Sequence, residues 1–210
     1  MKLYLSSQGL GNHVKRLQDM VGSNKQVLFI NNAKDYLSDS ERKTHVSEKK
    51  LEFESAGFKF NELDLRDYFI DNGGLEDRIR SGGMVWGSGG NSFLLMRAMH
   101  YSGLDAMLSN HLKHGNLVYG GSSAGSIVVT KSLHGTELGD SPYEIADGYK
   151  EEIIWDGLAL VHPQIVPHVG SDWLGAKAME DYFKAEVIEY IALRDGEVYI
   201  VDGEYEEHLK

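Results

Sequence analysis

Short apolar runs alternate along this chain with stretches of helical periodicity, and this alternation constrains the fold more than any other feature. The run QVLFIN at residues 26–31 is mostly apolar, as is typical of a strand buried on both faces of a sheet. Strand, helix and strand at this spacing predict βαβ units, and therefore a mostly parallel sheet with helices on both faces. We expect strands at residues 2–6, 26–31, 58–65, 83–86, 117–119, 158–161, 190–193 and 198–201, and helices at residues 14–21, 39–55, 75–80, 93–100, 104–113 and 180–187.

The C-terminal stretch has a different pattern. The sequence YIALRDGEVYIVDGE begins at Tyr190 and contains two apolar runs separated by Asp195-Gly196. Asp-Gly between two such runs is a turn signal, so we expect a C-terminal β-hairpin with its turn at these residues. All three prolines lie between residues 141 and 167, which we expect to be the least regular region.

Length and charge limit the classes of function. The 210 residues suit one α/β domain and no linker marks a boundary, so we expect a single domain over residues 1–210. A net charge of −11 disfavours nucleic acid as a partner and favours a small molecule or peptide. The absence of cysteine excludes disulfides, cysteine-ligated zinc and a cysteine nucleophile. No apolar run approaches the roughly 18 residues of a membrane span, and the N-terminal run is too short for a signal peptide, so we expect a cytoplasmic protein without a membrane partner.

Small residues crowd between two apolar segments in LVYGGSSAGSIVV, at residues 117–129. The segment contains a G-x-S-x-G match centred on Ser123, between an expected strand and an expected helix. A serine at such a sharp turn is lifted out of the sheet, and flanking glycines avoid clashes with neighbouring elements. Ser123 is therefore a candidate nucleophile, with the Ala124 N–H as the first oxyanion donor. The alternative is that Ser123 only caps the helix.

A second turn of the same kind occurs one strand earlier, in MVWGSGGNSF. Gly89 and Gly90 follow the apolar run there and can bring another backbone N–H to an oxyanion. The alternative is a dinucleotide-binding loop, but the third glycine of that pattern is missing and the segment lies far from the first strand.

A nucleophilic serine needs a base and an orienting acid. Seven of the nine histidines lie in polar helical stretches, a glycine-rich loop or the charged tail, which leaves His162 and His168 as candidates. We favour His168 because it comes just after a strand-like run, whereas His162 lies inside an apolar run and is expected to be buried. Asp195 ends a strand and is the candidate acid, although Asp-Gly is also a turn signal by itself. Asp156 is the rival acid.

The segments GGNSF, GSSAGS, PH and LRDG, at residues 89–93, 121–126, 167–168 and 193–196, together resemble the peptidase E family of serine peptidases, which includes α-aspartyl dipeptidases and cyanophycinases. The resemblance covers most of the chain. It implies a flavodoxin-like fold akin to class I glutamine amidotransferase domains. It also implies that Ser123 is the nucleophile, His168 the general base, Asp195 the third triad member, and Ala124 with Gly89 and Gly90 the oxyanion hole. No metal or cofactor is implied.

This chain departs from the family pattern in two respects, the triad acid and the substrate-binding residues. The third member is often Glu, so Glu189 and Glu197 are nearby substitutes for Asp195. The segment after His168 offers Lys177 and Lys184 but no Arg for an aspartate side chain, and Ser122 stands where a bulky aromatic residue is common. The resemblance therefore implies hydrolysis of small peptides, such as dipeptides, through an acyl-enzyme, and the departures argue against aspartyl specificity.

Two other functions are compatible with the sequence alone. The first is an α/β-hydrolase esterase, whose chain order of serine, acid and histidine would require Asp156. The second is a flavodoxin-like module that binds a small ligand without catalysis. A third possibility is an inactive relative of the peptidases that has kept the fold and lost the catalytic geometry, for which Asp195 is the reason. The polar helix expected at residues 39–55 fits either a solvent-exposed face or a homodimer contact.

Overall fold

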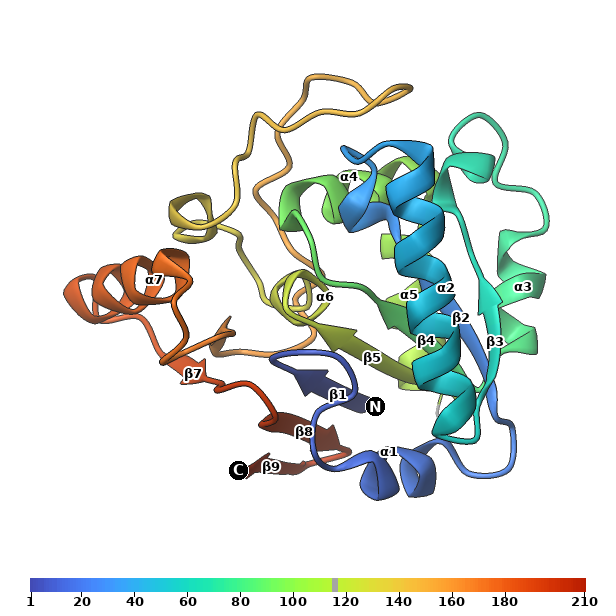
Figure 1. The fold of residues 1–210 in the computed structure, drawn as a ribbon, viewed down its shortest axis with the longest axis horizontal. Coiled ribbons are helices and arrows are strands. Elements are labelled where there is room, and N and C mark those ends of the chain that lie inside the picture. The colour runs from blue at the N-terminus through green and yellow to red at the C-terminus, as the bar shows by residue number, and fades with distance from the viewer. Residues whose placement is uncertain (115–116) are drawn as a thin grey trace.

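A seven-stranded sheet runs through the centre of the computed structural model, which describes residues 1–114 and 117–210 (Figure 1). The strand order is β3-β2-β4-β5-β1-β8-β9. The strands are β1 (Lys2–Ser6), β2 (Gln26–Ile30), β3 (Lys59–Glu62), β4 (Met84–Gly87), β5 (Val118–Ser122), β8 (Val198–Asp202) and β9 (Tyr205–Leu209). The first five are parallel to their neighbours among themselves, whereas β8 and β9 are antiparallel. The expected mostly parallel sheet is confirmed.

Helices cover both faces of this sheet, as expected. On β2, Val27 and Phe29 face a core completed by α1 (Val14–Val21) and α2 (Asp39–Ser55). Leu28 and Ile30 face the opposite core. That core is completed by α3 (Leu75–Ser81), α4 (Ser92–Ser102), α5 (Leu104–Lys113) and α6 (Ala124–Ile127). No helix in the described part of the chain is long and apolar enough to cross a membrane.

The C-terminal hairpin exists, but its predicted position was wrong. The strand before Asp195, β7 (Tyr190–Ala192), pairs in parallel with β6 (Gln164–Val166) in a separate two-stranded sheet. The two strands are joined through α7 (Leu174–Ala185), so they form a βαβ unit and β7 is not available to β8. The hairpin is instead β8–β9, where Asp202 pairs with Tyr205 across the turn.

The strand predicted at residues 158–161 was also wrong. This stretch donates hydrogen bonds from Leu158 and Leu160 to the carbonyls of Val128 and Val129, just after α6, and does not join a sheet. Residues 139–163 contain no helix and no strand beyond a single bridge from Asp156 to Ser132. The region expected to be irregular, residues 141–167, is therefore irregular as far as residue 163, whereas its end forms the strand β6.

The irregular region is held over α4 by a buried arginine. The side chain of Arg97 is 1% exposed and donates to the carbonyls of Glu152, Glu144 and Pro142 at 2.6, 2.7 and 2.5 Å. Three carbonyl acceptors satisfy the guanidinium in place of water, so its burial orders the loop.

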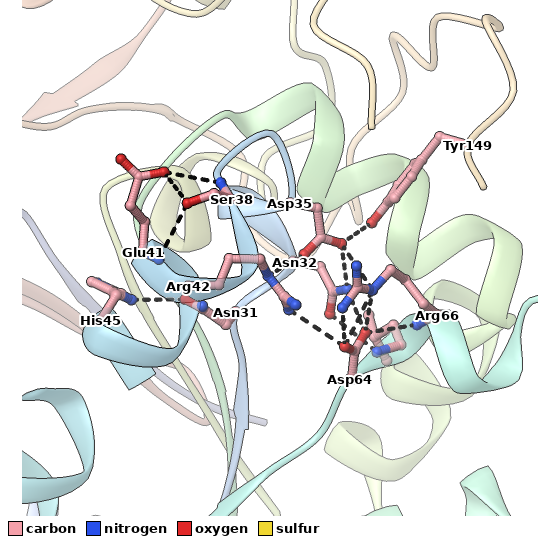
Figure 2. Close-up of polar contacts among 11 residues, drawn as sticks. Asn31, Asn32, Asp35, Ser38, Glu41, Arg42, His45, Asp64, Arg66 and Tyr149 are labelled. Carbon is pink, nitrogen blue, oxygen red and sulfur yellow. Dashed lines mark hydrogen bonds and ion pairs between the residues drawn. The ribbon is translucent and has the colours of Figure 1, made fainter. Parts of the chain in front are cut away.

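A polar network at the ends of β2 and β3 also contacts this loop, through Tyr149 (Figure 2). Tyr149, from the loop, donates a 2.6 Å hydrogen bond to Asp35, whose carboxylate is fully buried and lies 2.8 Å from Arg42 Nε. Asp64 pairs with Arg66 at 2.6 Å. Burial raises the pKa of the Asp35 carboxyl, whereas the hydrogen bonds to Asp64 outweigh its burial and lower its pKa to about 2.

His45 on α2 gives the fold a pH-dependent stability. Its Nδ1 lies 2.8 Å from Asn31 Oδ1 (Figure 2), and burial, with Lys34 and Lys49 nearby, lowers the pKa of His45 from 6.5 to about 4. Because the unfolded chain binds this proton more readily, the free energy of unfolding should fall as the pH decreases from about 6.5 toward 4. Urea unfolding of wild type and His45→Gln at neutral and mildly acidic pH checks this: the variant should lose less stability on acidification. An equal loss of stability in wild type and variant would show that His45 is not the group responsible.

Candidate active site

Ser123 occupies a strained turn between β5 and α6. Its backbone has φ of 50° and ψ of −112°, a region that non-glycine residues rarely adopt. The turn is held by a hydrogen bond from the Ser123 N–H to the Ser6 carbonyl at 3.2 Å and by one from the Ser126 N–H to the Ser123 carbonyl at 2.8 Å. The Ser123 side chain makes no capping hydrogen bond to α6, so the interpretation as a helix cap is not supported.

The glycines around Ser123 are required by close backbone approaches. A Cβ on Gly121 would lie 2.3 Å from the Gly125 carbonyl oxygen, and one on Gly125 would lie 2.1 Å from that of Gly87. Neither glycine has positive φ, so space rather than backbone conformation excludes a side chain. The crowding of small residues therefore allows β4, β5 and α6 to meet at the turn.

The second turn lies directly beside the first. A Cβ on Gly89 would be 3.3 Å from Ser123 Cβ. Gly90 has φ of 144°, and a Cβ there would be 2.3 Å from the Ala33 carbonyl oxygen. In the part of the chain that the structure describes, the N–H groups of Gly89, Gly90 and Ala124 donate to no protein acceptor. Two turns thus bring unpaired backbone donors to the carboxyl edge of the sheet next to Ser123, where sites form in such folds.

His168 and Asp195 are brought together by the small sheet. They follow β6 and β7, and hydrogen bonds from Leu193 N–H to the Val166 carbonyl and from Val169 N–H to the Leu193 carbonyl keep the two strand ends side by side. His168 Nδ1 lies 2.7 Å from Asp195 Oδ1. The pair predicted as base and acid is therefore in direct contact, whereas Ser123 Oγ and the His168 ring make no hydrogen bond within the described residues.

The rival residues lie elsewhere. His162 is 90% exposed and pairs with Glu189 at 3.4 Å, so the expectation that it is buried was wrong; the preceding stretch does not enter the sheet. Glu197 accepts from His208 at 3.0 Å, and Asp156 is exposed in its bridge with Ser132. None of these three carboxylates contacts His168 in the described chain.

Ser7 is a member of the site that the sequence reasoning missed. Its buried hydroxyl donates to Asp195 Oδ1 at 2.7 Å and accepts from the backbone N–H of His168 at 2.8 Å. Ser7 directly follows β1, and Ser6 in β1 pairs in register with Ser122 in β5. Sites in such folds form at the carboxyl ends of the strands, so the serine that directly follows the first strand could have been singled out from the sequence. Ser7 thereby connects the His168–Asp195 pair to the end of β1, the strand that pairs with β5.

Asp140 supports the second turn from the irregular loop. Its carboxylate accepts from the N–H and the hydroxyl of Ser92, at 2.9 and 2.6 Å, where α4 begins. Burial raises the pKa of Asp140, while these hydrogen bonds and the nearby His168 act in the opposite direction. The loop therefore reaches the neighbourhood of His168 and fixes the helix that follows Gly90.

The chain is similar in sequence to known peptidases. A model of peptidase family S51 matches residues 4–208. An uncharacterized peptidase of Pasteurella multocida (strain Pm70) is 27% identical over 145 residues, which are 69% of this chain and 65% of that protein. A Drosophila melanogaster protein named "Probable alpha-aspartyl dipeptidase" is 28% identical over 137 residues, 61% of this chain and 54% of that protein. The alignments thus span less than two thirds of either relative.

The fold also matches a solved structure. A Listeria monocytogenes EGD-e protein described as a peptidase E superposes with a TM-score of 0.78 at 21% identity, and the match covers 100% of this chain and 98% of that one. At this identity the match shows the fold alone.

Proposed function

Because the chain belongs to peptidase family S51, we propose that it is a serine peptidase that hydrolyses small peptides with Ser123 as nucleophile, His168 as general base and Asp195 as the third member of the triad. The observation that carries this proposal is the 2.7 Å contact between His168 Nδ1 and Asp195 Oδ1, at the same edge of the fold as the strained Ser123 turn. A positive-φ serine that does not cap its helix has a conformation suited to presenting a hydroxyl to substrate.

The proposed reaction is acyl transfer. Asp195 accepts from the Nδ1–H of His168, which leaves Nε2 free to act as the base. As Ser123 Oγ attacks the scissile carbonyl, Nε2 takes the hydroxyl proton and then donates it to the leaving amine when the C–N bond breaks. Water, deprotonated by the same nitrogen, hydrolyses the acyl-enzyme and restores the Ser123 hydroxyl. The missing hydrogen bond between Ser123 and His168 is compatible with these roles, since such contacts often tighten only when substrate binds.

The unpaired N–H groups of Ala124 and of the Gly89–Gly90 turn supply the proposed oxyanion hole. Their donors are backbone groups in two turns held by close packing, so they need little reorganisation during the reaction. Each such donor is worth about 3 kcal/mol of transition-state stabilisation in enzymes of this type.

Product analysis tests the proposed activity. The protein is incubated with a mixture of dipeptides and tripeptides, and the free amino acids released are measured by mass spectrometry, before and after treatment with a serine-directed phosphonate. We expect peptide hydrolysis that the phosphonate abolishes. Hydrolysis of simple esters but of no peptide would instead favour an esterase.

The Ser7 hydroxyl should influence the acid–base pair without touching substrate. Ser7→Ala removes a hydrogen bond to a charged group, an interaction worth about 1.5–3 kcal/mol, so we expect kcat to fall by about tenfold to a hundredfold. The pH at which kcat/KM reaches half its maximum should also shift, because His168 loses part of its support. Ser6→Ala is the matched control: its buried hydroxyl donates to the carbonyls of Gly9 and Gly121 and does not contact Asp195. The same pH profile in both variants would argue against a role for Ser7.

A further inference from the structure

The indole of Trp173 lies beside the ring of His168, the proposed general base. Trp173 immediately precedes α7, and its ring lies edge-on to the His168 ring, with centroids 5.6 Å apart and planes at 87°. The intervening turn is held by hydrogen bonds from Ser171 N–H to the His168 carbonyl and from Trp173 N–H to Ser171 Oγ. A residue that touches the general base is within reach of the side chains that flank a scissile bond.

Two glycines make room for this aromatic ring. A Cβ on Gly139 or on Gly175 would lie 2.5 Å from Trp173 Cζ2. Gly139 has φ of −117° and Gly175 lies inside α7, so neither position needs glycine for its backbone conformation. Gly139 follows η3 (Thr136–Leu138), which lies against α7 (Figure 1). The loop and the helix therefore meet around a flat side chain next to His168.

Two residues next to Gly139 and Trp173 in the sequence leave apolar surface in solvent. Leu138, just before Gly139, is 47% exposed, and Leu174, just after Trp173, is 83% exposed. Exposed apolar side chains that adjoin a concave or catalytic site are typical of surfaces that bind apolar groups.

The charges nearby are unfavourable for an anionic side chain. The two lysines of α7 pair with carboxylates of the same helix, Lys177 with Asp181 at 2.7 Å and Lys184 with Glu180 at 3.4 Å. On the loop side, the Asp140 carboxyl lies near His168 and supplies no positive charge there. Each α7 lysine therefore already has a carboxylate partner on its own helix.

We infer that Trp173 is a specificity-determining residue, against which an apolar or aromatic side chain of the substrate packs next to the scissile bond, and that aspartate is disfavoured there. This inference rests on the proposed peptidase function. It concerns which peptides the site selects, and the reaction steps stay the same.

Kinetics on a matched set of dipeptides test the inference. We compare kcat/KM for Phe-Ala, Ala-Phe, Asp-Ala, Asn-Ala and Ala-Ala with wild type, Trp173→Phe and Trp173→Ala. Wild type should prefer one of the two phenylalanine dipeptides over both Ala-Ala and Asp-Ala by about tenfold, which is within the range of discrimination that apolar pockets provide. Trp173→Ala should remove most of that preference through a higher KM, and Trp173→Phe should retain it.

Two results would overturn the inference. The first is that Asp-Ala is the best substrate. The second is that Trp173→Ala lowers kcat/KM equally for phenylalanine and alanine dipeptides, because Trp173 would then only position His168. Labelling of Ser123 by diisopropyl fluorophosphate distinguishes failure of the inferred specificity from failure of the proposed function. If Ser123 is labelled but the protein shows no preference for apolar side chains, only the inference is refuted. No labelling and no hydrolysis would refute the proposed function, and the inference would fall with it.

Discussion

Ser123→Ala should reduce peptide hydrolysis to the background of the assay. Loss of the nucleophile removes the acyl-enzyme route altogether, and in serine peptidases such a change costs about 10⁶-fold in kcat. The fold should persist, because the Ser123 side chain makes no hydrogen bond that holds α6 and its turn is fixed by backbone contacts. The measurement is kcat on the best dipeptide, with circular dichroism to confirm that the variant is folded.

Ser122→Ala is the matched control for this experiment. Ser122 is the neighbouring serine in the same motif, lies at the end of β5 and makes no side-chain hydrogen bond within the described chain. It should retain most of the activity. Loss of activity in Ser122→Ala with retention in Ser123→Ala would move the nucleophile and refute the proposed site.

Asp195→Asn should have the second-largest effect. The substitution keeps the size of the side chain, but the amide no longer fixes His168 with a proton on Nδ1, and the equivalent change in a Ser-His-Asp triad lowers kcat about 10⁴-fold. The contact is well placed for this role, with Nδ1 and Oδ1 separated by 2.7 Å and Ser7 donating to the same oxygen. Values of kcat measured across the pH range check the prediction.

Asp156→Asn is the control that distinguishes the two candidate acids: Asp195, which follows His168 in the chain, and Asp156, which precedes it as in an α/β-hydrolase esterase. Asp156 is exposed and bridges Ser132, so its replacement should leave catalysis intact. The opposite pattern, with activity lost in Asp156→Asn and kept in Asp195→Asn, would support the esterase order and contradict the triad proposed here.

Much of the fold was predictable because it follows from local patterns. Buried strands such as β2 are apolar on both faces, and this pattern together with the intervening helices indicates a parallel sheet. The turn at Ser123 was visible as well, since close packing of three elements requires glycine at Gly121 and Gly125. The pairing of His168 with Asp195 followed from placing both residues at strand ends.

The errors arose where pairing depends on distant partners. The runs before and after Asp195 look like one hairpin locally, but β7 pairs with β6 across α7 and β8 pairs with β1. Because β8 is antiparallel to β1, the first residue of β8, Val198, pairs with Ser6 at the end of β1. Asp195 lies shortly before β8 and therefore comes close to Ser7. Such tertiary pairing has no signature in a single sequence, and neither does the packing of Trp173 between two glycines.

Covalent labelling tests the central claim most directly. Intact-mass spectrometry after incubation with a fluorophosphonate, on wild type, Ser123→Ala and His168→Ala, reports whether Ser123 is activated by His168. We predict a single adduct on wild type, located on Ser123 by peptide mapping, and no adduct on either variant. A folded wild-type protein that forms no adduct, or an adduct that persists in Ser123→Ala, would contradict the account.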